Sequence, residues 1–496
     1  MSRATTHSLR NSAIPKGKEI NPPLIHADEA VGAPLKTIRE FTSEGIVSSF
    51  RGEVTIHKFL FSKLLLRIMI IIPVKIPSIQ LLSKTAILRG QLPLNRIAEP
   101  NEKIASTVAE ILKSIREKGD PALLRYTQKF DRATFTAKSI RLRSKAPQPD
   151  LPIVRLLDGA LKNIRAFSKR TIPKKWSQKN SDGAWVGEIY HPIQRVGLYV
   201  PGGTAPLVSS ALMTVGLAQL AGVPEIVVAT PPRINPFLHY ALERCGATEI
   251  YQMGGAQAIG ALAYGTQTIK RVQKIFGPGN AFVVEAKRQV CGAVAIDLLP
   301  GPSEIAVIAD ETANPAFIAA DLLAQGEHGH GSQAILISPS LTILKAVQQE
   351  LLKQAQQCSR KEYIMEVLEQ GCHLLLVPTL ELALTLADQY APEHLSLIVK
   401  NPERAIPKMK NSGAIFIGNY SPVAVGDYWA GPSHTLPTGG AGKSFPGLTI
   451  EQFYKRTSMV QYDAVSMRKA APKVAALAEL EKLDAHAQSA MIRFHE

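Results

Sequence analysis

Cysteine is scarce in this sequence: the chain has four in 496 residues, and no two of them form a CxxC pair. So few thiols cannot build a disulfide-stabilised scaffold, and the missing pairs exclude a zinc module made of cysteines. Because scarce, unpaired thiols are typical of proteins from a reducing compartment, we expect a cytoplasmic location. The four residues are Cys245, Cys291, Cys358 and Cys372.

A long apolar run without charges is also missing. The nearest candidate, residues 59–76, contains Lys63, Arg67, Lys75 and Pro73. Since each charge at the centre of a bilayer costs about 2.5–3.5 kcal/mol on insertion scales, this stretch does not span a membrane. It also lies too far from the start of the chain to form the core of a secretory signal. We therefore expect no membrane partner.

Aromatic residues make up only 6% of the chain, although its net charge of +16 would suit a polyanionic partner. A surface that binds nucleic acid needs basic clusters interleaved with aromatic side chains. Here the histidines and acids gather in motifs instead, so we expect an enzyme that binds no nucleic acid. A non-catalytic binding protein with the same fold is the alternative from a different functional class.

Residues 1–68 lack the periodicity of the rest of the chain and contain ten basic and six acidic residues. Three interpretations compete: an organelle-targeting peptide, an adaptor tail, or an upstream extension with Met69 as the effective start. Transit peptides are poor in acidic residues, so organelle targeting by residues 1–68 is the weaker interpretation. We expect residues 1–76 to form a poorly ordered N-terminal extension.

Short apolar runs alternate with helix-compatible segments beyond Trp185. This alternation predicts an α/β fold with parallel sheets covered on both faces, and its length suffices for two doubly wound units. An amphipathic helix is predicted from Asn101 to Tyr126, stopped at Gly119, and a terminal helix over 473–494. The predicted strands are Val196–Val200, Glu225–Ala229, Glu249–Met253, Val294–Leu298, Ile305–Ile308, Ala334–Ile337, Leu374–Val377 and Leu395–Val399.

Three polar turns follow predicted strands, which is where open α/β sheets bind ligands. Glycines in Tyr199–Thr204 and Phe276–Asn280 would let backbone amides approach a phosphate. Neither turn matches the GxGxxG fingerprint, and each is equally compatible with a tight structural turn. Gln257, in the third turn, could donate its amide to a ligand or simply begin a helix in water.

Candidate metal ligands occur in two places. A helix that begins at Asn314 would present Gln325 and His328 on one face if it continues past residue 326, and the two could then meet one cation. A lone histidine at a helix end is more often a partner of the helix dipole. In the Gly-rich loop 426–434, Asp427 could ligate a metal and His434 could bind substrate.

A carboxylic acid and an imidazole stand side by side at Glu393 and His394, just before a predicted strand. Such a pair suits general acid–base catalysis, because histidine exchanges a proton near neutral pH and burial can raise the pKa of a glutamic acid. A solvated pair explains the same two residues equally well. His486, five residues after Glu481 on the predicted terminal helix, becomes a ligand candidate only if another element docks there.

Taken in order, these segments resemble histidinol dehydrogenases over nearly the whole chain, from about Pro77 to Phe494. Residues 1–68 have no counterpart in that family. The motifs that carry the resemblance are GLYVPGGTAPL (Gly197–Leu207), GGAQAI (Gly254–Ile259), KIFGPGNAFV (Lys274–Val283), GPSE (Gly301–Glu304), DLLAQGEHG (Asp321–Gly329), APEHLS (Ala391–Ser396), GDYWAGPSHTLPT (Gly426–Thr438) and EKLDAH (Glu481–His486).

The resemblance implies a zinc-dependent homodimer that oxidises L-histidinol to L-histidine with two NAD⁺, the last step of histidine biosynthesis. It implies an acid–base pair, Glu393 and His394, and one Zn²⁺ per subunit. The implied zinc ligands are Gln325, His328, Asp427 and His486. The implied NAD contacts are Tyr199, Gln257 and Asn280. The implied substrate site comprises Ser303, Gln325, His328, Glu393, Asp427, His434, Glu481 and His486, the last two supplied across the dimer interface.

The implied architecture is two Rossmann-like domains, each an incomplete, doubly wound parallel sheet, with small helical C-terminal elements. Residues 77–92 would form an arm that packs with the C-terminal region, and residues 449–496 the dimerisation elements. Residues 93–198 and 305–448 would form the first domain, and 199–304 the second, on the NAD side.

Two enzymatic alternatives stay open. A related zinc and NAD dehydrogenase would act on another amino alcohol or a polyol. A different mechanism would trap the aldehyde on a cysteine, Cys245 or Cys291, although neither has a neighbouring histidine in the sequence.

Overall fold

The computed structural model describes residues 77–90, 101–202 and 207–494. All of them belong to the unit that runs from Pro73 to the C-terminus. The predicted extension, residues 1–76, lies outside the described residues. None of the described helices is both long and apolar enough to cross a membrane.

The first six-stranded sheet is parallel except for its short edge strand β2, and its order is β2-β7-β6-β5-β8-β9. Among its parallel strands, the central strand β5 comes first in the chain. The strands β6 and β7 are added on one side of it, and β8 and β9 then follow on the other side. This order places the switch point of the sheet between β5 and β8. The strands are β2 (Arg141–Leu142), β5 (Arg195–Tyr199), β6 (Glu225–Thr230), β7 (Glu249–Gln252), β8 (Lys274–Phe276) and β9 (Ala295–Ile296).

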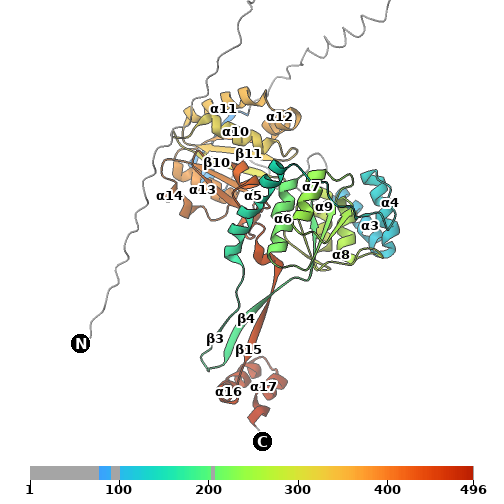
Figure 1. Ribbon diagram of the computed structural model, residues 1–496. Helices are drawn as coiled ribbons and strands as arrows, with labels where there is room; N and C mark the ends of the chain where they lie inside the picture. The colour runs from blue at the N-terminus through green and yellow to red at the C-terminus, as the bar shows by residue number, and fades with distance from the viewer. Residues whose placement is uncertain (1–76, 91–100, 203–206, 495–496) are drawn as a thin grey trace, which may run out of the picture. The chain divides into compact units, whose positions relative to one another are not determined.

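Helices cover both faces of this sheet (Figure 1). Side chains alternate along β6, so Ile226 and Val228 join one core cluster with α5, α6 and α7, while Val227 and Ala229 join the other with α3, α8 and α9. The helices are α3 (Glu102–Lys118), α4 (Asp120–Asp131), α5 (Leu151–Ser168), α6 (Val208–Leu220), α7 (Pro236–Arg244), α8 (Gly255–Tyr264) and α9 (Ala281–Val290).

The second six-stranded sheet is wholly parallel, with the order β1-β12-β11-β10-β13-β14. It repeats the winding of the first sheet, with its switch point between β10 and β13. Its strands are β1 (Ile79–Leu81), β10 (Glu304–Ala309), β11 (Gln333–Ser338), β12 (Cys372–Leu376), β13 (His394–Ile398) and β14 (Ala414–Ile417). The doubly wound α/β class predicted from the sequence is confirmed in both sheets.

Helices also pack on both faces of the second sheet, with α10, α11 and α12 in one core cluster and α2 and α13 in the other. The helices are α2 (Lys84–Leu88), α10 (Pro315–Gly326), α11 (Leu341–Ala355), α12 (Lys361–Gln370), α13 (Leu380–Tyr390), α14 (Pro402–Ala405) and α15 (Val423–Tyr428). Short 3-10 turns are η1 (Lys169–Thr171), η2 (Ile406–Lys408), η3 (Ala441–Lys443), η4 (Ile450–Phe453) and η5 (Ile492–Phe494).

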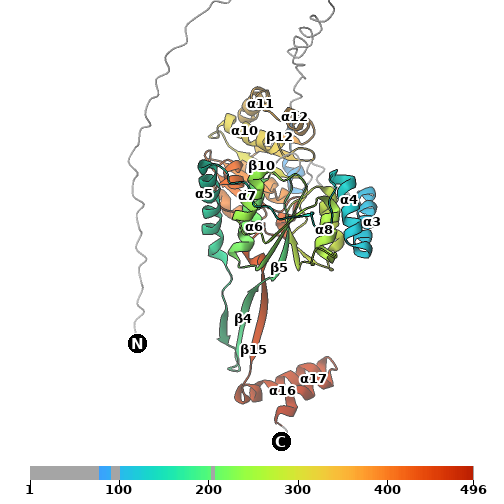
Figure 2. The ribbon, with the colours of Figure 1, turned by 45° about the vertical axis from the view of Figure 1, so that its right-hand side comes forward.

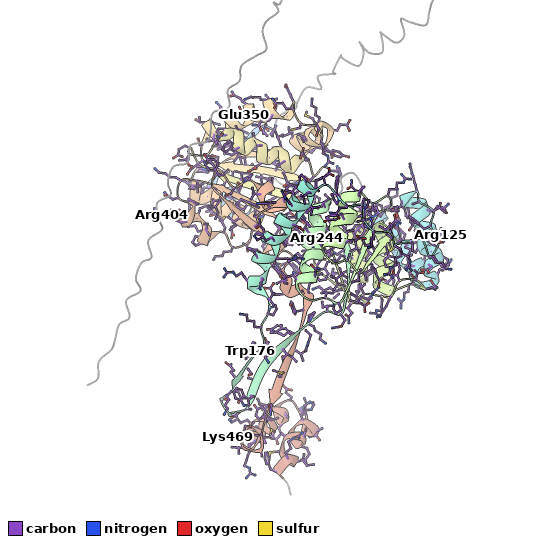
Figure 3. The ribbon with its side chains drawn as sticks, in the orientation of Figure 1. Arg125, Trp176, Arg244, Glu350, Arg404 and Lys469 are labelled. Carbon is purple, nitrogen blue, oxygen red and sulfur yellow. The ribbon has the colours of Figure 1, made fainter. Side chains whose placement is uncertain are left out.

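A three-stranded antiparallel sheet, β15-β4-β3, leads to the C-terminal helices α16 and α17, and we call this part the arm. Both views draw the helices at the end of β15 that points away from the two large sheets (Figures 1 and 2). Trp176 and Lys469, labelled in Figure 3, lie along the arm. Its elements are β3 (Trp176–Lys179), β4 (Trp185–Pro192), β15 (Tyr454–Gln461), α16 (Ala464–Leu480) and α17 (Asp484–Met491).

The helix predicted from Asn101 ends at Gly119, as predicted, because Gly119 has a φ of 63°; the residues that follow form a second helix, α4. The other predicted helix is wrong in its extent. The predicted terminal helix starts earlier, because Asp463 forms a capping box with Ser466, and it breaks near Lys482, which has a φ of 59°. Glu481 and His486 therefore do not share one helix.

The strand pairing and packing differ from the predicted domain division. Residues 102–168 pack on the sheet that contains β5 to β9, so they do not group with 305–448 as the division of 93–198 requires. The reason is physical: α3 and α5 bring the apolar faces that cover the two sides of that sheet. In the N-terminal segment predicted over 77–92, β1 pairs with β12 and α2 packs on α13.

Candidate active site

The amino ends of β10 and β13 bring the predicted acid–base residues together with Ser303. These strands are parallel neighbours with Ile305 opposite His394, so residues just before them meet at one edge of the sheet. The Ser303 hydroxyl donates to Glu393 Oε2 at 2.6 Å, and the Glu304 amide donates to the same oxygen at 2.9 Å. The chain thus holds the Glu393 carboxyl in one orientation.

His394 is buried, and its two ring nitrogens have different surroundings. Its Nδ1 lies 3.0 Å from the backbone oxygen of Glu304. Because a carbonyl oxygen can only accept, Nδ1 carries the hydrogen and Nε2 keeps its lone pair. Nε2 has no hydrogen-bond partner and lies 3.8 Å from Asp427 Oδ1. Burial lowers the pKa of His394, which keeps the ring neutral and able to accept a proton.

The pKa of Glu393 shifts in the opposite direction to that of His394. Burial raises its pKa to about 8, against the two hydrogen bonds from Ser303 and Glu304, which favour the ionised form and lower it. The side chain is only 6% exposed, so desolvation outweighs those bonds. A carboxyl group with a pKa near neutrality is suited to give or take protons during turnover.

The predicted metal ligands Gln325, His328 and Asp427 lie on adjacent elements. α10 ends at Gly326, so His328 follows the helix instead of sharing its face with Gln325, and α15, which carries Asp427, packs on α10. The Gln325 amide nitrogen is buried without a partner. Burial, together with the nearby imidazoles of His394 and His434, lowers the pKa of His328 to about 4.

His434 connects this cluster to the first sheet. Its Nδ1 lies 2.9 Å from the Asp427 backbone oxygen, and its Nε2 lies 3.3 Å from the Ser210 hydroxyl on α6. Burial lowers the pKa of His434, which keeps a second neutral imidazole beside His328. The site therefore lies where the amino edge of the second sheet meets α6 of the first.

The donor set fits a borderline cation such as Zn²⁺, which accepts imidazole nitrogen and carboxylate oxygen. The side-chain oxygen of Gln325 would be a third ligand, and the Gln325 Nε2 would point away from the ion. In the described part of a single chain, however, no three His, Cys, Asp or Glu side chains are arranged to hold a metal ion. His486 on α17 and Glu481 at the end of α16 are exposed, and both views draw these two helices away from the large sheets (Figures 1 and 2).

The predicted NAD contacts lie at the carboxyl edge of the first sheet. Tyr199 ends β5, and its hydroxyl accepts from the Gly255 amide at 3.2 Å. Burial raises the pKa of Tyr199 to about 12, so the hydroxyl stays protonated. Asn280 caps α9 by accepting from the backbone amides of Phe282 and Val283, at 3.1 and 3.2 Å. Part of its side chain is thus committed to the helix.

Glycine is required where the two turns approach each other. Gly277 has a φ of 110°, and a Cβ there would lie 2.1 Å from the backbone oxygen of Tyr199. The side chains of Lys287 and Asp297 also bind Gly277. Lys287 Nζ donates to the Gly277 backbone oxygen at 2.9 Å, and the Gly277 amide donates to Asp297 at 2.8 Å. This contact fixes the turn that follows β8 at the switch point.

Sequence reasoning missed several residues of these clusters. Gln257 Nε2 donates to Asp131 Oδ2 at 3.1 Å, although Asp131 ends α4, more than a hundred residues earlier. Ser210 and Glu304 were likewise not singled out as partners of His434 and of the acid–base pair. No local motif marks these residues, because their contacts depend on how distant elements pack.

Comparison with known proteins identifies the family to which this chain belongs. The sequence model of the histidinol dehydrogenases matches residues 94–494. The histidinol dehydrogenase of Heliobacterium mobile is 42% identical over 402 residues, which cover 79% of this chain and 94% of that protein. The one from Geobacillus kaustophilus is 40% identical over 417 residues, covering 82% and 98%. This chain belongs to the histidinol dehydrogenase family.

A solved structure agrees with this assignment. The crystal structure of histidinol dehydrogenase from Elizabethkingia anophelis matches with a TM-score of 0.78 and 35% identity, covering 84% of this chain and 98% of that chain. As a histidinol dehydrogenase family member, the chain is an oxidoreductase of histidine biosynthesis. Every predicted site residue falls within the matched range 94–494, and residues 1–68 fall outside it.

Proposed function

We propose that this protein oxidises L-histidinol to L-histidine through the aldehyde, passing two hydrides to NAD⁺ in a zinc-dependent reaction. The observation that carries the proposal is the buried pair of His394, whose Nε2 has a free lone pair, and Glu393, whose pKa is raised to about 8. Both lie among Gln325, His328 and Asp427, the nitrogen and oxygen donors that a zinc ion accepts.

His394 is the base of the first oxidation. The substrate hydroxyl gives its proton to Nε2, while the carbon that bears it gives a hydride to the dinucleotide, and the product is an aldehyde. The hydrogen bond from Nδ1 to the Glu304 backbone oxygen fixes the tautomer and stabilises the imidazolium that results. The Glu393 carboxyl lies beside Nδ1, 3.5 Å from it, so it does not compete for the substrate proton at Nε2 and acts in the next step.

Glu393 acts in the second oxidation. Its ionised carboxylate takes a proton from water as the water oxygen bonds to the aldehyde carbon. The hydrate carries a negative oxygen because Glu393 keeps the proton from water. It then loses a hydride to a second NAD⁺, which yields the carboxylic acid. The hydrogen bonds from Ser303 and the Glu304 amide stabilise the ionised form that this step requires.

The zinc ligands would be Gln325, His328 and Asp427 of one chain with His486 of the partner subunit. A Zn²⁺ ion bound by nitrogen and oxygen ligands can add the nitrogens of an imidazole and an amine, which orients an amino alcohol substrate. His434 of the same chain and the partner subunit's Glu481 would contact the same substrate. One zinc per subunit follows from this ligand count.

The arm supports a homodimer. Leu480, Val465 and Leu477 on α16 are 81%, 68% and 65% exposed, and Val460 on β15 is 70% exposed. Large apolar side chains gathered on one element mark an interaction surface, and a second copy of this chain would cover them. The arm would then deliver His486 and Glu481 to the site of the other subunit.

A cysteine nucleophile is the weaker mechanism. Cys245 is fully buried, and burial raises the pKa of its thiol to about 12, so it stays protonated. Cys291 is exposed at the end of α9, on the first sheet, and is not among the residues gathered around His394. All four cysteines are free, which is compatible with the cytoplasmic location that we propose.

Metal analysis and an NADH assay test the proposed function. We expect about one zinc per subunit in the purified protein, from the four-ligand site. We also expect NADH from both histidinol and its aldehyde, and loss of both activities on chelation. No NADH from either compound would overturn the proposal, and faster turnover of another amino alcohol or a polyol would favour the alternative dehydrogenase.

A further inference from the structure

Asp131 is not part of a strand-to-helix turn of the first sheet, but its side chain contacts the turn between β7 and α8. It is the last residue of α4, and its Oδ2 accepts from the Gly254 amide at 3.2 Å and from Gln257 Nε2 at 3.1 Å. A Cβ at Gly254 would lie 2.8 Å from Asp131 Oδ1, so a larger residue there would displace the carboxylate. The turn is therefore shaped around this carboxylate.

The carboxylate fixes which way the Gln257 amide faces. An ionised carboxylate only accepts hydrogen bonds, so Gln257 must point its NH₂ group at Asp131 and its oxygen the other way. Gln257 is 1% exposed, which leaves little room for the amide to turn. Its Oε1 lies over Gly255, 2.8 Å from where a Cβ would stand, so the oxygen faces the start of α8 and not Asp131.

Two of the backbone amides at the start of α8 are already engaged. Among the amides at its start, that of Gly254 is bound by Asp131 and that of Gly255 by the Tyr199 hydroxyl. A helix start of this kind otherwise offers its amides to phosphate, and a carboxylate there repels one. What this turn presents to a dinucleotide is an acceptor, the oxygen of Gln257.

We infer that Asp131 is a positioning residue for the dinucleotide: it holds Gln257 so that Oε1 accepts a hydrogen bond from a donor group of the cofactor, a hydroxyl or a carboxamide NH₂. Asp131 acts through Gln257 and does not touch the cofactor itself. This inference rests on the proposed function, because it takes Gln257 as part of the NAD⁺ site.

The test is equilibrium binding of NAD⁺ to the full-length protein by calorimetry, followed by steady-state kinetics. Asp131→Ala removes the acceptor, and we expect the Kd and KM for NAD⁺ to rise about tenfold, the worth of one well-placed hydrogen bond. The kcat and the KM for histidinol should change less than about twofold, because the acid–base pair is untouched. Asp131→Asn keeps an oxygen that can accept from both donors, so it should bind NAD⁺ within about threefold of wild type.

A double-mutant cycle separates positioning from direct contact. In a Gln257→Ala background, Asp131→Ala should cause no further loss of affinity, because there is no amide left to orient. Equal losses in both backgrounds would overturn the inference, and so would wild-type affinity in Asp131→Ala. Glu110→Gln removes a charge from an exposed position on α3 and controls for net charge. If the wild-type protein itself bound no NAD⁺, the proposed function would fail instead.

Discussion

His394 Nε2 lies 3.8 Å from Asp427 Oδ1. The separation is too long for a hydrogen bond, so the nitrogen keeps its lone pair while the carboxylate stays close enough to stabilise a positive charge on the ring. A base that is neutral before the reaction and stabilised after it is what removal of a hydroxyl proton requires. The proton acceptor on β13, His394, thus lies beside a candidate zinc ligand on α15, Asp427.

The two members of the acid–base pair should fail at different steps. His394→Asn removes the proton acceptor and should slow histidinol oxidation by about 10²–10⁴-fold, while oxidation of added aldehyde changes much less. Glu393→Gln should slow aldehyde oxidation by a similar factor and leave the first hydride transfer nearly intact. Single-turnover NADH formation from each compound measures the two steps, and equal effects on both would contradict the division of roles.

The pH dependence of aldehyde oxidation should report Glu393. Its pKa is raised to about 8 by burial, so below that pH the group is protonated and cannot take a proton from water. The rate should fall about tenfold for each pH unit below 8 and level off above it. In Glu393→Gln this limb should vanish. Rates of the wild-type protein that are constant from pH 6 to 9 would rule out Glu393 as the base.

Shared active sites should reveal themselves by complementation. Asp427→Ala and His486→Ala should each be inactive alone. Co-expressed, they should recover roughly a quarter of wild-type activity, because half of randomly paired dimers are mixed and each mixed dimer contains one intact site. His486→Ala with Glu481→Gln is the matched control: both residues belong to the arm, so each site of a mixed dimer stays defective. Recovery in neither case would mean that the arm does not complete the partner's site.

The ion pair of Lys287 and Asp297 should matter more for stability than an exposed one. Both side chains are fully buried, and both also hold Gly277. Lys287→Met leaves the Asp297 charge unpaired and should lower the free energy of unfolding by about 3–5 kcal/mol. Arg244, labelled in Figure 3, pairs with Asp158 at the surface, and Arg244→Ala should cost less than about 1 kcal/mol. Urea unfolding measures both, and equal losses would refute the comparison.

The sequence predicted the buried strands well and the strands of the arm not at all. Runs such as Val196–Val200 and Glu225–Ala229 lie within one residue of β5 and β6, because a strand buried on both faces must be continuously apolar. The strands β4 and β15 carry mixed side chains, mostly half-buried on β4 and exposed on β15, so neither period nor composition marks them. The arm is specified by pairing between residues more than two hundred positions apart.

The candidate site shows the same limit. Glu393 and His394 were found because they are adjacent in the sequence, and their grouping with Ser303 follows from the register of β10 and β13. Asp131 could not be found in this way. Its partner Gln257 is distant in the sequence, and the contact exists only because α4 packs against α8.

The stoichiometry of NADH formation tests the central claim most directly. A known, limiting amount of L-histidinol is incubated to completion with the zinc-loaded protein and excess NAD⁺, and the NADH formed is counted by absorbance. Because both oxidations take place at one site, the account predicts two NADH for each histidinol, with histidine as the product. One NADH with accumulated aldehyde, or none at all, would contradict it.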